Sequence, residues 1–353
     1  MSSLDTESFD SSDYLASPNN YSFLKDLDLD SDVVRRMSLQ LDTIVKGNND
    51  VYTTPLLKEH SASDILEGWD RIVQSNSHLL NQPLADLELL NRSKFGPRSI
   101  ASPWVDRRSD VESYFHKSDS SSIPHFDLVL PVNTLRPISL DSAIKLLKNS
   151  TNAGLPYYCK KKVIKPYLPD RLEDLLLRED PCILFTRTQE NGKTRTVWGY
   201  PIADTTFEMM YYSPLLNYQR ALDWRAAIRG PEEIDKWVTR LIDFALSNGL
   251  ELLSIDFKSF DASISKELIY ESFRYVKSLF QSKYHLDLDR ICRRFNTIGI
   301  VTPSGVLRGS HGVPSGSTFT NEIDSISQHL IAIQSGLVFN GAYQIQGDDG
   351  VYA

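Results

Sequence analysis

The spacing of apolar residues along the chain predicts a mixture of helices and strands. Apolar residues recur every three or four positions in several stretches, which is typical of helices with one buried face. These stretches are residues 63–80, 203–222, 232–248, 266–280 and 320–333. Alternation of polar and apolar residues in Tyr343–Gln346 and again in Val351–Tyr352 instead predicts a hairpin. The apolar run Glu251–Asp256 predicts a buried strand that ends in an acid.

An acidic turn stands at the tip of the predicted hairpin. Asp348 and Asp349 follow Gly347, and both Gly347 and Gly350 permit positive φ or close backbone approach. Adjacent carboxylates repel each other unless a cation neutralises them, and Mg²⁺ is usually held by one or two carboxylates together with substrate phosphates. Taken alone, a Gly-Asp-Asp-Gly sequence is more often a solvated turn.

Two further acids follow the predicted strand. Asp256 ends the strand, and Asp261 lies five residues further along the chain. Chemistry is common where a strand gives way to a loop. The alternative is a turn or capping acid, although Ser263 and Ser265 lie nearer the next helix and fit that capping role better.

A loop rich in glycine and serine, Gly312–Thr320, precedes the last predicted helix. Ser315 and Gly316 lie in a segment that can move and can offer backbone N–H groups to a phosphate. An ordinary loop in which Ser or Thr caps the helix is the alternative.

A basic hairpin is predicted for Thr186–Pro201, with its turn at Asn191-Gly192. This turn places Lys193 and Arg195 on one face of the returning strand. Arg grips phosphate oxygens with two N–H groups, while Lys acts as a compact point charge. The simpler interpretation is a basic strand whose charges face water.

Further upstream, the loop Ser150–Tyr157 is followed at once by Lys160 and Lys161. A basic cluster beside an aromatic-bearing loop suits a track for single-stranded RNA that does not depend on its sequence. A cluster of lysines is more often a solubilising surface.

Taken together and in this order, the segments resemble the palm domain of viral RNA-dependent RNA polymerases. Asp256–Asp261 resembles motif A, the segment Ser315–Asp324 resembles motif B, and Gly347-Asp348-Asp349 resembles motif C. The basic hairpin and the Ser150–Tyr157 loop resemble motifs F and G. The residues around Ser315 are similar to the partitivirus and picobirnavirus group of bisegmented double-stranded RNA viruses. The resemblance covers about 200 residues, from near Ser150 to the end.

This resemblance implies an α+β right-hand polymerase with fingers and an antiparallel palm sheet. It implies two Mg²⁺ ions, with Mn²⁺ as a substitute, held by Asp256 and Asp348 with support from Asp349. The implied NTP-binding residues are Arg187, Lys193, Arg195, Asp261, Ser315, Gly316, Thr320 and Asp324. The implied RNA-binding residues are Thr151, Gly154, Pro156, Lys160 and Lys161.

Two departures from the family pattern stand out. Asp324 occupies a position where many positive-strand virus polymerases have asparagine. The chain also ends at Ala353, four residues after Asp349 and before motifs D and E and the thumb. We therefore expect the thumb to be absent or truncated, which puts the activity of this chain alone in question.

The expected domain organisation has four parts. Residues 1–32 form an acidic mobile tail, and residues 33–150 form an N-terminal extension with part of the fingers. Residues 151–250 hold motifs G and F and the first palm helices. Residues 251–353 form the palm core with motifs A, B and C and an inserted fingers segment.

Composition limits these expectations only weakly. The 353 residues are 41% hydrophobic and 24% charged, enough for a large core. The net charge of −8 comes mostly from the first 50 residues, which hold ten acids and four bases, so it does not argue against RNA binding. The three cysteines have no metal-site or disulfide spacing. No signal peptide or membrane span is expected.

The expected partners are an RNA template and product, NTPs and a viral capsid protein, with no membrane. The expected location is the host cytoplasm, within the viral particle. Two alternatives stay open: a reverse transcriptase or another palm-domain polymerase, and a non-enzymatic RNA- or NTP-binding fragment. The first lacks support because Gln346-Gly347-Asp348-Asp349 has no aromatic residue before the acids and because Thr320 favours ribose.

Overall fold

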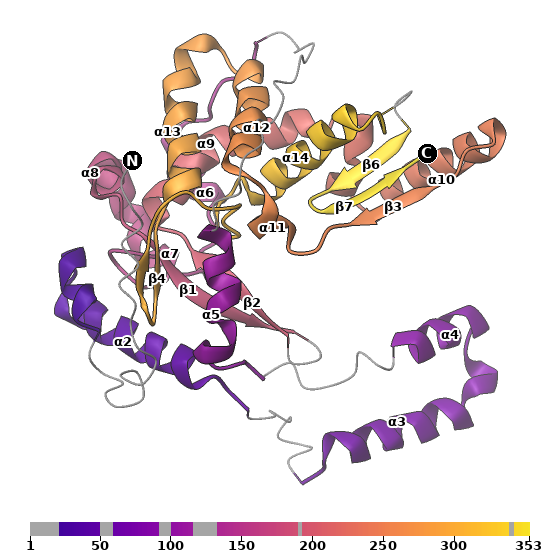
Figure 1. Cartoon of the computed structure of the whole chain (residues 1–353). Coiled ribbons are helices and arrows are strands. Elements are labelled where there is room, and N and C mark those ends of the chain that lie inside the picture. Colours follow the sequence, from indigo (N-terminus) through magenta and orange to yellow (C-terminus); the bar gives the residue numbers. More distant parts are fainter. Residues whose placement is uncertain (1–20, 50–58, 92–99, 116–132, 190–192, 339–341) are drawn as a thin grey trace.

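The computed structural model describes residues 21–49, 59–91, 100–115, 133–189, 193–338 and 342–353 (Figure 1). With η marking 3-10 helices, the helices are η1 (Ser22–Leu27), α2 (Ser31–Lys46), α3 (Ala62–Ser75), η3 (Ser77–Leu79), α4 (Gln82–Asn91), α5 (Trp104–Glu112), η5 (Ser113–Phe115), α6 (Leu140–Leu146), α7 (Lys161–Ile164), η6 (Lys165–Tyr167), α8 (Leu168–Arg178), α9 (Ile202–Gln219), η8 (Asp223–Ile228), α10 (Pro231–Asn248), α11 (Phe260–Ser263), α12 (Lys266–Leu279), η9 (Ser282–Tyr284), α13 (His285–Thr297) and α14 (Thr320–Gln334). The strands are β1 (Cys182–Thr188), β2 (Thr194–Gly199), β3 (Leu253–Asp256), β4 (Ile300–Thr302), β5 (Gly305–Leu307), β6 (Tyr343–Gln346) and β7 (Asp349–Tyr352). No described helix is long and apolar enough to cross a membrane.

The C-terminal strands form a three-stranded antiparallel sheet in the order β3-β7-β6. The hairpin predicted for residues 343–352 is confirmed, and Gly347 takes the positive φ of 66° that its turn requires. The prediction of a buried strand from Glu251 was wrong. The strand begins at Leu253, and Leu252 and Leu253 are 46% and 45% exposed.

A second sheet has the order β2-β1-β4-β5. The β1–β2 pair is antiparallel, as predicted for a basic hairpin, while β1 and β4 run parallel. The predicted turn at Asn191-Gly192 lies outside the described residues. This sheet brings residues near 185 beside residues near 300, so each sheet joins parts of the chain that are distant in sequence.

Helix α14 runs through the main core and is buried on nearly all sides. Its apolar residues Ile323, Ile326 and Leu330 pack with α9, α12 and α13 in one hydrophobic cluster. The apolar face predicted for α14 is confirmed except at Ile333, which is 38% exposed. The buried faces predicted for residues 63–80 and 232–248 are confirmed only in part, because Ile72 and Leu79 in the first stretch and Leu246 in the second are exposed. Ser265 caps α12 by accepting a hydrogen bond from the backbone N–H of Leu268, as its position predicted.

The N-terminal boundary differs from the expectation of a mobile tail up to residue 32. Tyr21, Leu24 and Leu27 are buried, and they pack in one cluster with α2 and with Ile183 and Leu184 of β1. The tail prediction was wrong for residues 21–32, because this segment carries an apolar residue about every third position. Residues 1–20 lie outside the described part of the chain.

A buried ion pair links η8 to α14. Arg225 and Glu322 are 0% and 1% exposed and approach to 2.6 Å. Arg225 also donates from Nη1 to the carbonyl oxygen of Ile345 in β6, at 3.3 Å. The guanidinium therefore connects η8, α14 and the hairpin, and its removal leaves a buried carboxylate without its counter-charge.

We predict that Arg225→Met lowers the free energy of unfolding by about 3–5 kcal/mol, because it strands the Glu322 charge in the core. The matched control is Arg35→Met, which breaks an exposed pair with Asp32 and is expected to cost about 0–1 kcal/mol. Urea unfolding followed by tryptophan fluorescence measures both. A loss no larger than that of the control would contradict the role given to Arg225.

Candidate functional site

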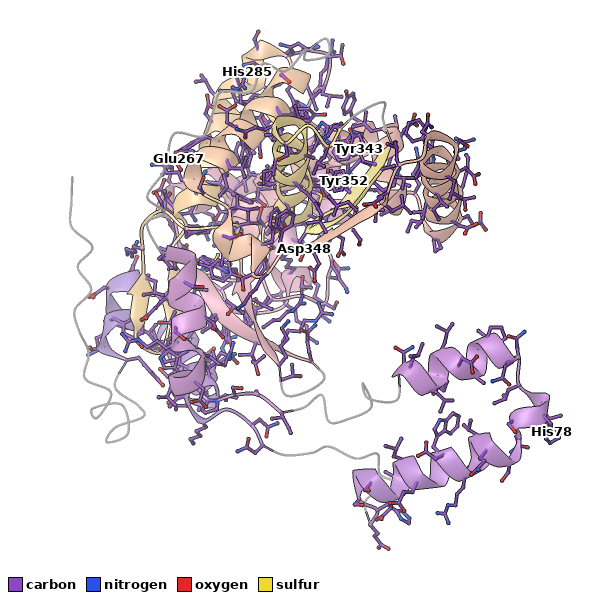
Figure 2. All side chains as sticks on the ribbon, turned by 45° about the vertical axis from the view of Figure 1, so that its right-hand side comes forward. His78, Glu267, His285, Tyr343, Asp348 and Tyr352 are labelled. Carbon is purple, nitrogen blue, oxygen red and sulfur yellow. The ribbon has the colours of Figure 1, made fainter. Side chains whose placement is uncertain are left out.

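The acidic turn lies where the two strands of the hairpin meet. Figure 2 places Asp348 at the tip of the hairpin, at the end away from Tyr343 and Tyr352. Asp349 opens β7 and is the direct cross-strand partner of Asp256 at the end of β3. The structure thus brings together the three predicted metal ligands, Asp256, Asp348 and Asp349, from segments about 90 residues apart.

Polar side chains of α14 hold this turn. The backbone N–H of Gly347 donates to Ser325 Oγ at 2.8 Å, and Gln346 Nε2 donates to Asn321 Oδ1 at 3.0 Å. In the amide orientation that satisfies both of its ends, Gln328 donates to the carbonyl oxygens of Gly347 (2.9 Å) and Asp349 (3.2 Å). The backbone that carries the acids is therefore fixed by the helix that follows the motif B loop.

The acids influence one another electrostatically. Burial, followed by the charge of Asp348, raises the pKa of Asp261 to about 6, while Arg195 opposes the shift. Burial and the charges of Asp261 and Asp348 raise the pKa of Asp324. Burial, Asp348 and Asp256 raise the pKa of Asp349. Burial is the largest cause of each shift, and the repulsion between carboxylates that adds to it is what a bound cation would relieve.

The donor chemistry of the site fits Mg²⁺, which prefers carboxylate oxygens. Within the described ranges, no three His, Cys, Asp or Glu side chains already converge on one point as a metal would require. The cross-strand position of Asp256 and Asp349 and the adjacent Asp348 nevertheless put three carboxylates at one end of one sheet. The backbone positions of the three acids fit a bound Mg²⁺ ion, for which their side chains would have to turn toward one point.

The motif B loop, Gly312–Thr320, is wedged between three other segments. The N–H of Gly312 donates to the Tyr114 carbonyl at 2.9 Å, and that of Val313 donates to the Asp261 carbonyl at 2.7 Å. Ser315 Oγ donates to the Thr196 carbonyl at 3.3 Å, and a Cβ on Gly316 would lie 1.7 Å from the Trp198 carbonyl oxygen. The loop thus brings Ser315 and Gly316 against β2 and against the segment that carries Asp261.

The hydroxyl of Thr320 is already engaged within the loop. It donates to the carbonyl oxygens of Pro314 (2.8 Å) and Ser317 (2.9 Å). Asp324 Oδ1, one turn further along α14, is buried and has no hydrogen-bond partner among the described residues. Asp324 Oδ1 is therefore an acceptor that a hydroxyl group of a bound molecule could use.

The basic hairpin presents its predicted cations to solvent. Arg187 and Arg195 are direct cross-strand partners, and Lys193 immediately precedes β2. All three side chains are exposed. Two like charges directly opposite each other are destabilising in a sheet unless an anion neutralises them. Since the charge of Arg195 also reaches Asp261, this cationic face borders the acidic site.

The motif G loop divides into exposed and buried parts. Thr151 and Lys160 are exposed, whereas Pro156 and Lys161 are half-buried. Gly154 is buried, has φ of 68°, and would bring a Cβ to 2.5 Å from the Tyr200 carbonyl oxygen. The prediction that Gly154 contacts RNA is therefore not supported, because this glycine shapes the loop from inside.

Sequence reasoning missed several residues that shape the site. Burial raises the pKa of Tyr114 well above its ordinary value, with Asp261 and Asp324 adding to the shift, so its phenol lies near the acids. Glu208 accepts three hydrogen bonds from the motif B loop. Ser325 could have been found from its position one helical turn after Asn321, on the same face. No signal in the sequence marked Tyr114 or Glu208.

A family model described as viral RNA-dependent RNA polymerase matches residues 106–352. A protein described as a potential RNA-dependent RNA polymerase of human picobirnavirus is 28% identical over 352 residues, covering 87% of this chain and 63% of that protein. An RNA-directed RNA polymerase of Cryptosporidium parvum virus 1 is 28% identical over 239 residues, covering 60% of this chain and 43% of that protein. The chain therefore spans less than two thirds of the length of each curated relative.

A solved structure gives the same indication about the fold. The crystal structure of the RNA-dependent RNA polymerase of a human picobirnavirus matches with a TM-score of 0.70 and 24% identity. The match covers 89% of this chain and 66% of that one. It confirms the α+β right-hand polymerase fold expected from the sequence. The expectation about the thumb stays a prediction.

We predict that Gly316→Ala lowers the melting temperature, because the added Cβ meets the Trp198 carbonyl and the loop must move away from β2. The expected destabilisation is about 1–3 kcal/mol. Gly68→Ala is the control, since a Cβ on this helical glycine meets nothing within 4 Å, and alanine is the better helix former. Thermal unfolding in which both variants match the unaltered chain would contradict the close packing of the loop on β2.

Proposed function

Because the chain belongs to the family of viral RNA-dependent RNA polymerases, we propose that it is the fingers and palm of an enzyme that copies RNA. In this proposal it adds NTPs to the 3′ end of an RNA strand on an RNA template, for replication and transcription of a viral genome. The observation that carries the proposal is the meeting of Asp256, Asp348 and Asp349 at one end of the palm sheet, beside a loop and a cationic hairpin.

Asp256 and Asp348 are the proposed principal metal ligands, with Asp349 in support. Two Mg²⁺ ions, or Mn²⁺ in their place, would supply activation of the primer 3′-hydroxyl and neutralisation of the leaving pyrophosphate. The protein contributes positions rather than covalent chemistry. Ser325 accepts a hydrogen bond from the backbone of the turn, Gln328 donates two to it, and Asn321 accepts one from the Gln346 side chain. These bonds hold the turn in place, so little reorganisation is needed when substrate arrives.

The proposed triphosphate site is the cationic face of the β1–β2 hairpin. Arg187, Lys193 and Arg195 are exposed there, and the repulsion between Arg187 and Arg195 favours an anion between or over them. Arg can grip phosphate oxygens with two N–H groups. These contacts strengthen as negative charge moves to the pyrophosphate during the reaction, which is how they would accelerate it.

The proposed nucleoside site lies between the motif B loop and the buried acids. Ser315 and Gly316 monitor the shape of the new base pair, while base identity is read by pairing with the template. Asp261 and Asp324 face the ribose in this proposal, and Asp324 Oδ1 supplies an acceptor with no present partner. Thr320 can serve only as an acceptor while its own hydrogen stays within the loop.

The proposed template path runs over the exposed and half-buried residues of the motif G loop and over the two lysines that follow it. Thr151, Pro156, Lys160 and Lys161 are its contacts, whereas Gly154 only shapes the loop.

Residues 33–150 would form the N-terminal extension with part of the fingers, residues 151–250 the fingers and the first palm helices, and residues 251–353 the palm core. The proposed setting is the host cytoplasm within a viral particle, with capsid protein as a neighbour.

We predict that Asp348→Ala abolishes template-dependent NTP incorporation on a primed single-stranded RNA with Mg²⁺ or Mn²⁺, because it removes a principal metal ligand. Asp235→Ala, at an exposed position on α10, should leave incorporation unchanged. Mg²⁺ should also raise the melting temperature of the unaltered chain and not that of Asp348→Ala, since only the former presents all three carboxylates.

Each outcome of this experiment bears on a different part of the proposal. Equal product from Asp348→Ala and the unaltered chain would overturn the metal-site assignment. Incorporation of dNTPs as readily as NTPs would favour the alternative of a reverse transcriptase-like enzyme. A Mg²⁺-dependent rise in melting temperature without any product would mean that the site binds metal but that these 353 residues are not a sufficient enzyme.

We predict that Arg195→Ala raises the KM for NTP by about tenfold or more, because a charge-assisted hydrogen bond to phosphate contributes about 1.5–3 kcal/mol. Arg195→Lys should fall between this variant and the unaltered chain, since it keeps the charge and loses the two-pronged grip. Arg35→Ala, at an exposed position on α2, serves as the charge-matched control. Steady-state kinetics with NTP varied at fixed primed RNA gives the values, and an unchanged KM in Arg195→Ala would count against the triphosphate site.

A further inference from the structure

Glu208 on α9 is a buried acid that contacts the motif B loop directly. It is 3% exposed, and its Oε2 accepts hydrogen bonds from Ser317 Oγ (2.9 Å), the Thr318 backbone N–H (2.8 Å) and Thr318 Oγ1 (2.9 Å). Ser317 Oγ in turn accepts from the N–H of Phe319 at 3.0 Å. One carboxylate oxygen therefore organises three consecutive residues where the loop becomes α14.

The two halves of the loop are held differently. The first half is tied by backbone hydrogen bonds from Gly312 and Val313 to Tyr114 and Asp261. For the second half, Glu208 is the acidic side chain that accepts hydrogen bonds from the loop in the described part of the molecule. Ser315 and Gly316 lie between the two anchors, so their placement against β2 depends on both.

The surroundings of Glu208 make it available for this task. Asp204 lies one turn earlier on α9, but Arg294 of α13 already pairs with it at 2.8 and 3.0 Å. Lys161, at the start of α7 in the motif G segment, is the cation whose charge reaches Glu208. Burial, with a smaller contribution from the charge of Asp204, raises the pKa of Glu208 to about 7, against the opposing effect of the hydrogen bonds from Thr318 and Ser317. The hydrogen-bond donors that Glu208 contacts are therefore those of Ser317 and Thr318 in the loop.

We propose that Glu208 is a positioning residue for nucleotide selection, which holds the motif B loop in the arrangement that accepts a paired NTP. The inference rests on the proposed polymerase function and adds to it a residue outside every motif that the sequence analysis identified. Without Glu208, the N–H of Thr318 and the hydroxyl of Ser317 lose their acceptor, and the loop leaves its present arrangement for part of the time. The apparent affinity for NTP falls by the fraction of time that is lost.

The test compares Glu208→Ala and Glu208→Gln with Ser272→Ala. Glutamine keeps an acceptor oxygen at the same place. Ser272→Ala is a matched control, because it removes a buried hydrogen bond to Ser327 of the same helix, α14, away from the loop. The measurements are hydrogen–deuterium exchange of peptides that cover residues 312–320, melting temperature, and KM and kcat for NTP on primed RNA.

In Glu208→Ala we expect about tenfold faster exchange within residues 312–320 and a KM for NTP about tenfold higher, with a smaller change in kcat. Glu208→Gln should keep most of the exchange protection and stay within about threefold of the original KM, and Ser272→Ala should change neither. Loop exchange in Glu208→Ala that matches the unaltered chain, or that Ser272→Ala reproduces, would overturn the proposal. So would faster loop exchange accompanied by an unchanged KM in an active chain.

Two further arms keep the inference separate from the polymerase proposal and from misfolding. If the unaltered chain incorporates no NTP, the polymerase proposal for these residues fails, while the exchange of the loop still decides whether Glu208 holds it. If Glu208→Ala does not fold, Ser317→Ala removes one donor from the loop side and should speed exchange at residues 317–319. Unchanged exchange in that variant would then overturn the proposal.

Discussion

The site depends on one constraint, which is that a buried helix turns its polar side chains toward the turn that carries the acids. Ser325 and Asn321 meet Gly347 and Gln346 directly, and Gln328 spans the two ends of the turn. Because Ser325 and Gln328 are buried, an unmade hydrogen bond at either residue would cost more than a made one contributes. The position of Asp348 is therefore set by α14 rather than by the hairpin alone.

The same helix also carries the acid that pairs with a buried cation, Arg225. Arg225 neutralises Glu322 on α14, so the positive charge of Arg225 does not neutralise the acids of the turn. Burial, followed by the repulsion of neighbouring carboxylates, raises the pKa of Asp261 in motif A and of Asp349 in motif C. Glu322 has its counter-charge, whereas the carboxylates of the turn still repel one another. An acidic cluster of this kind attracts cations.

Local patterns predicted the parts of the structure that depend on local chemistry. The hairpin at residues 343–352, the helix after Ser265 and the cationic face with Lys193 and Arg195 follow from periodicity and turn residues. The exposure of Leu253 could not be predicted, because it depends on which strands pair and not on their own sequence. Glu208, Arg225 and Tyr114 were missed for a similar reason, since each acts through a partner that is distant in sequence, as Arg225 does through Glu322, 97 residues away. Gly154 was misjudged because a glycine in a loop can serve either a ligand or the packing of its own chain.

The pairing of distant strands also determines when the two sheets can form during folding. Strand β1 pairs with β4, and β3 pairs with β7, the last strand of the chain. Closing such long loops costs entropy before any pairing compensates for it, and non-local pairing makes folding slow. During synthesis, Asp256 leaves the ribosome well before Asp349, its cross-strand partner, is made. Until then, Leu253 of β3 and the preceding Leu252 have no neighbouring β7 strand. Asp256 therefore meets Asp348 and Asp349 only after β7 is made, and β3 lacks its partner strand until then.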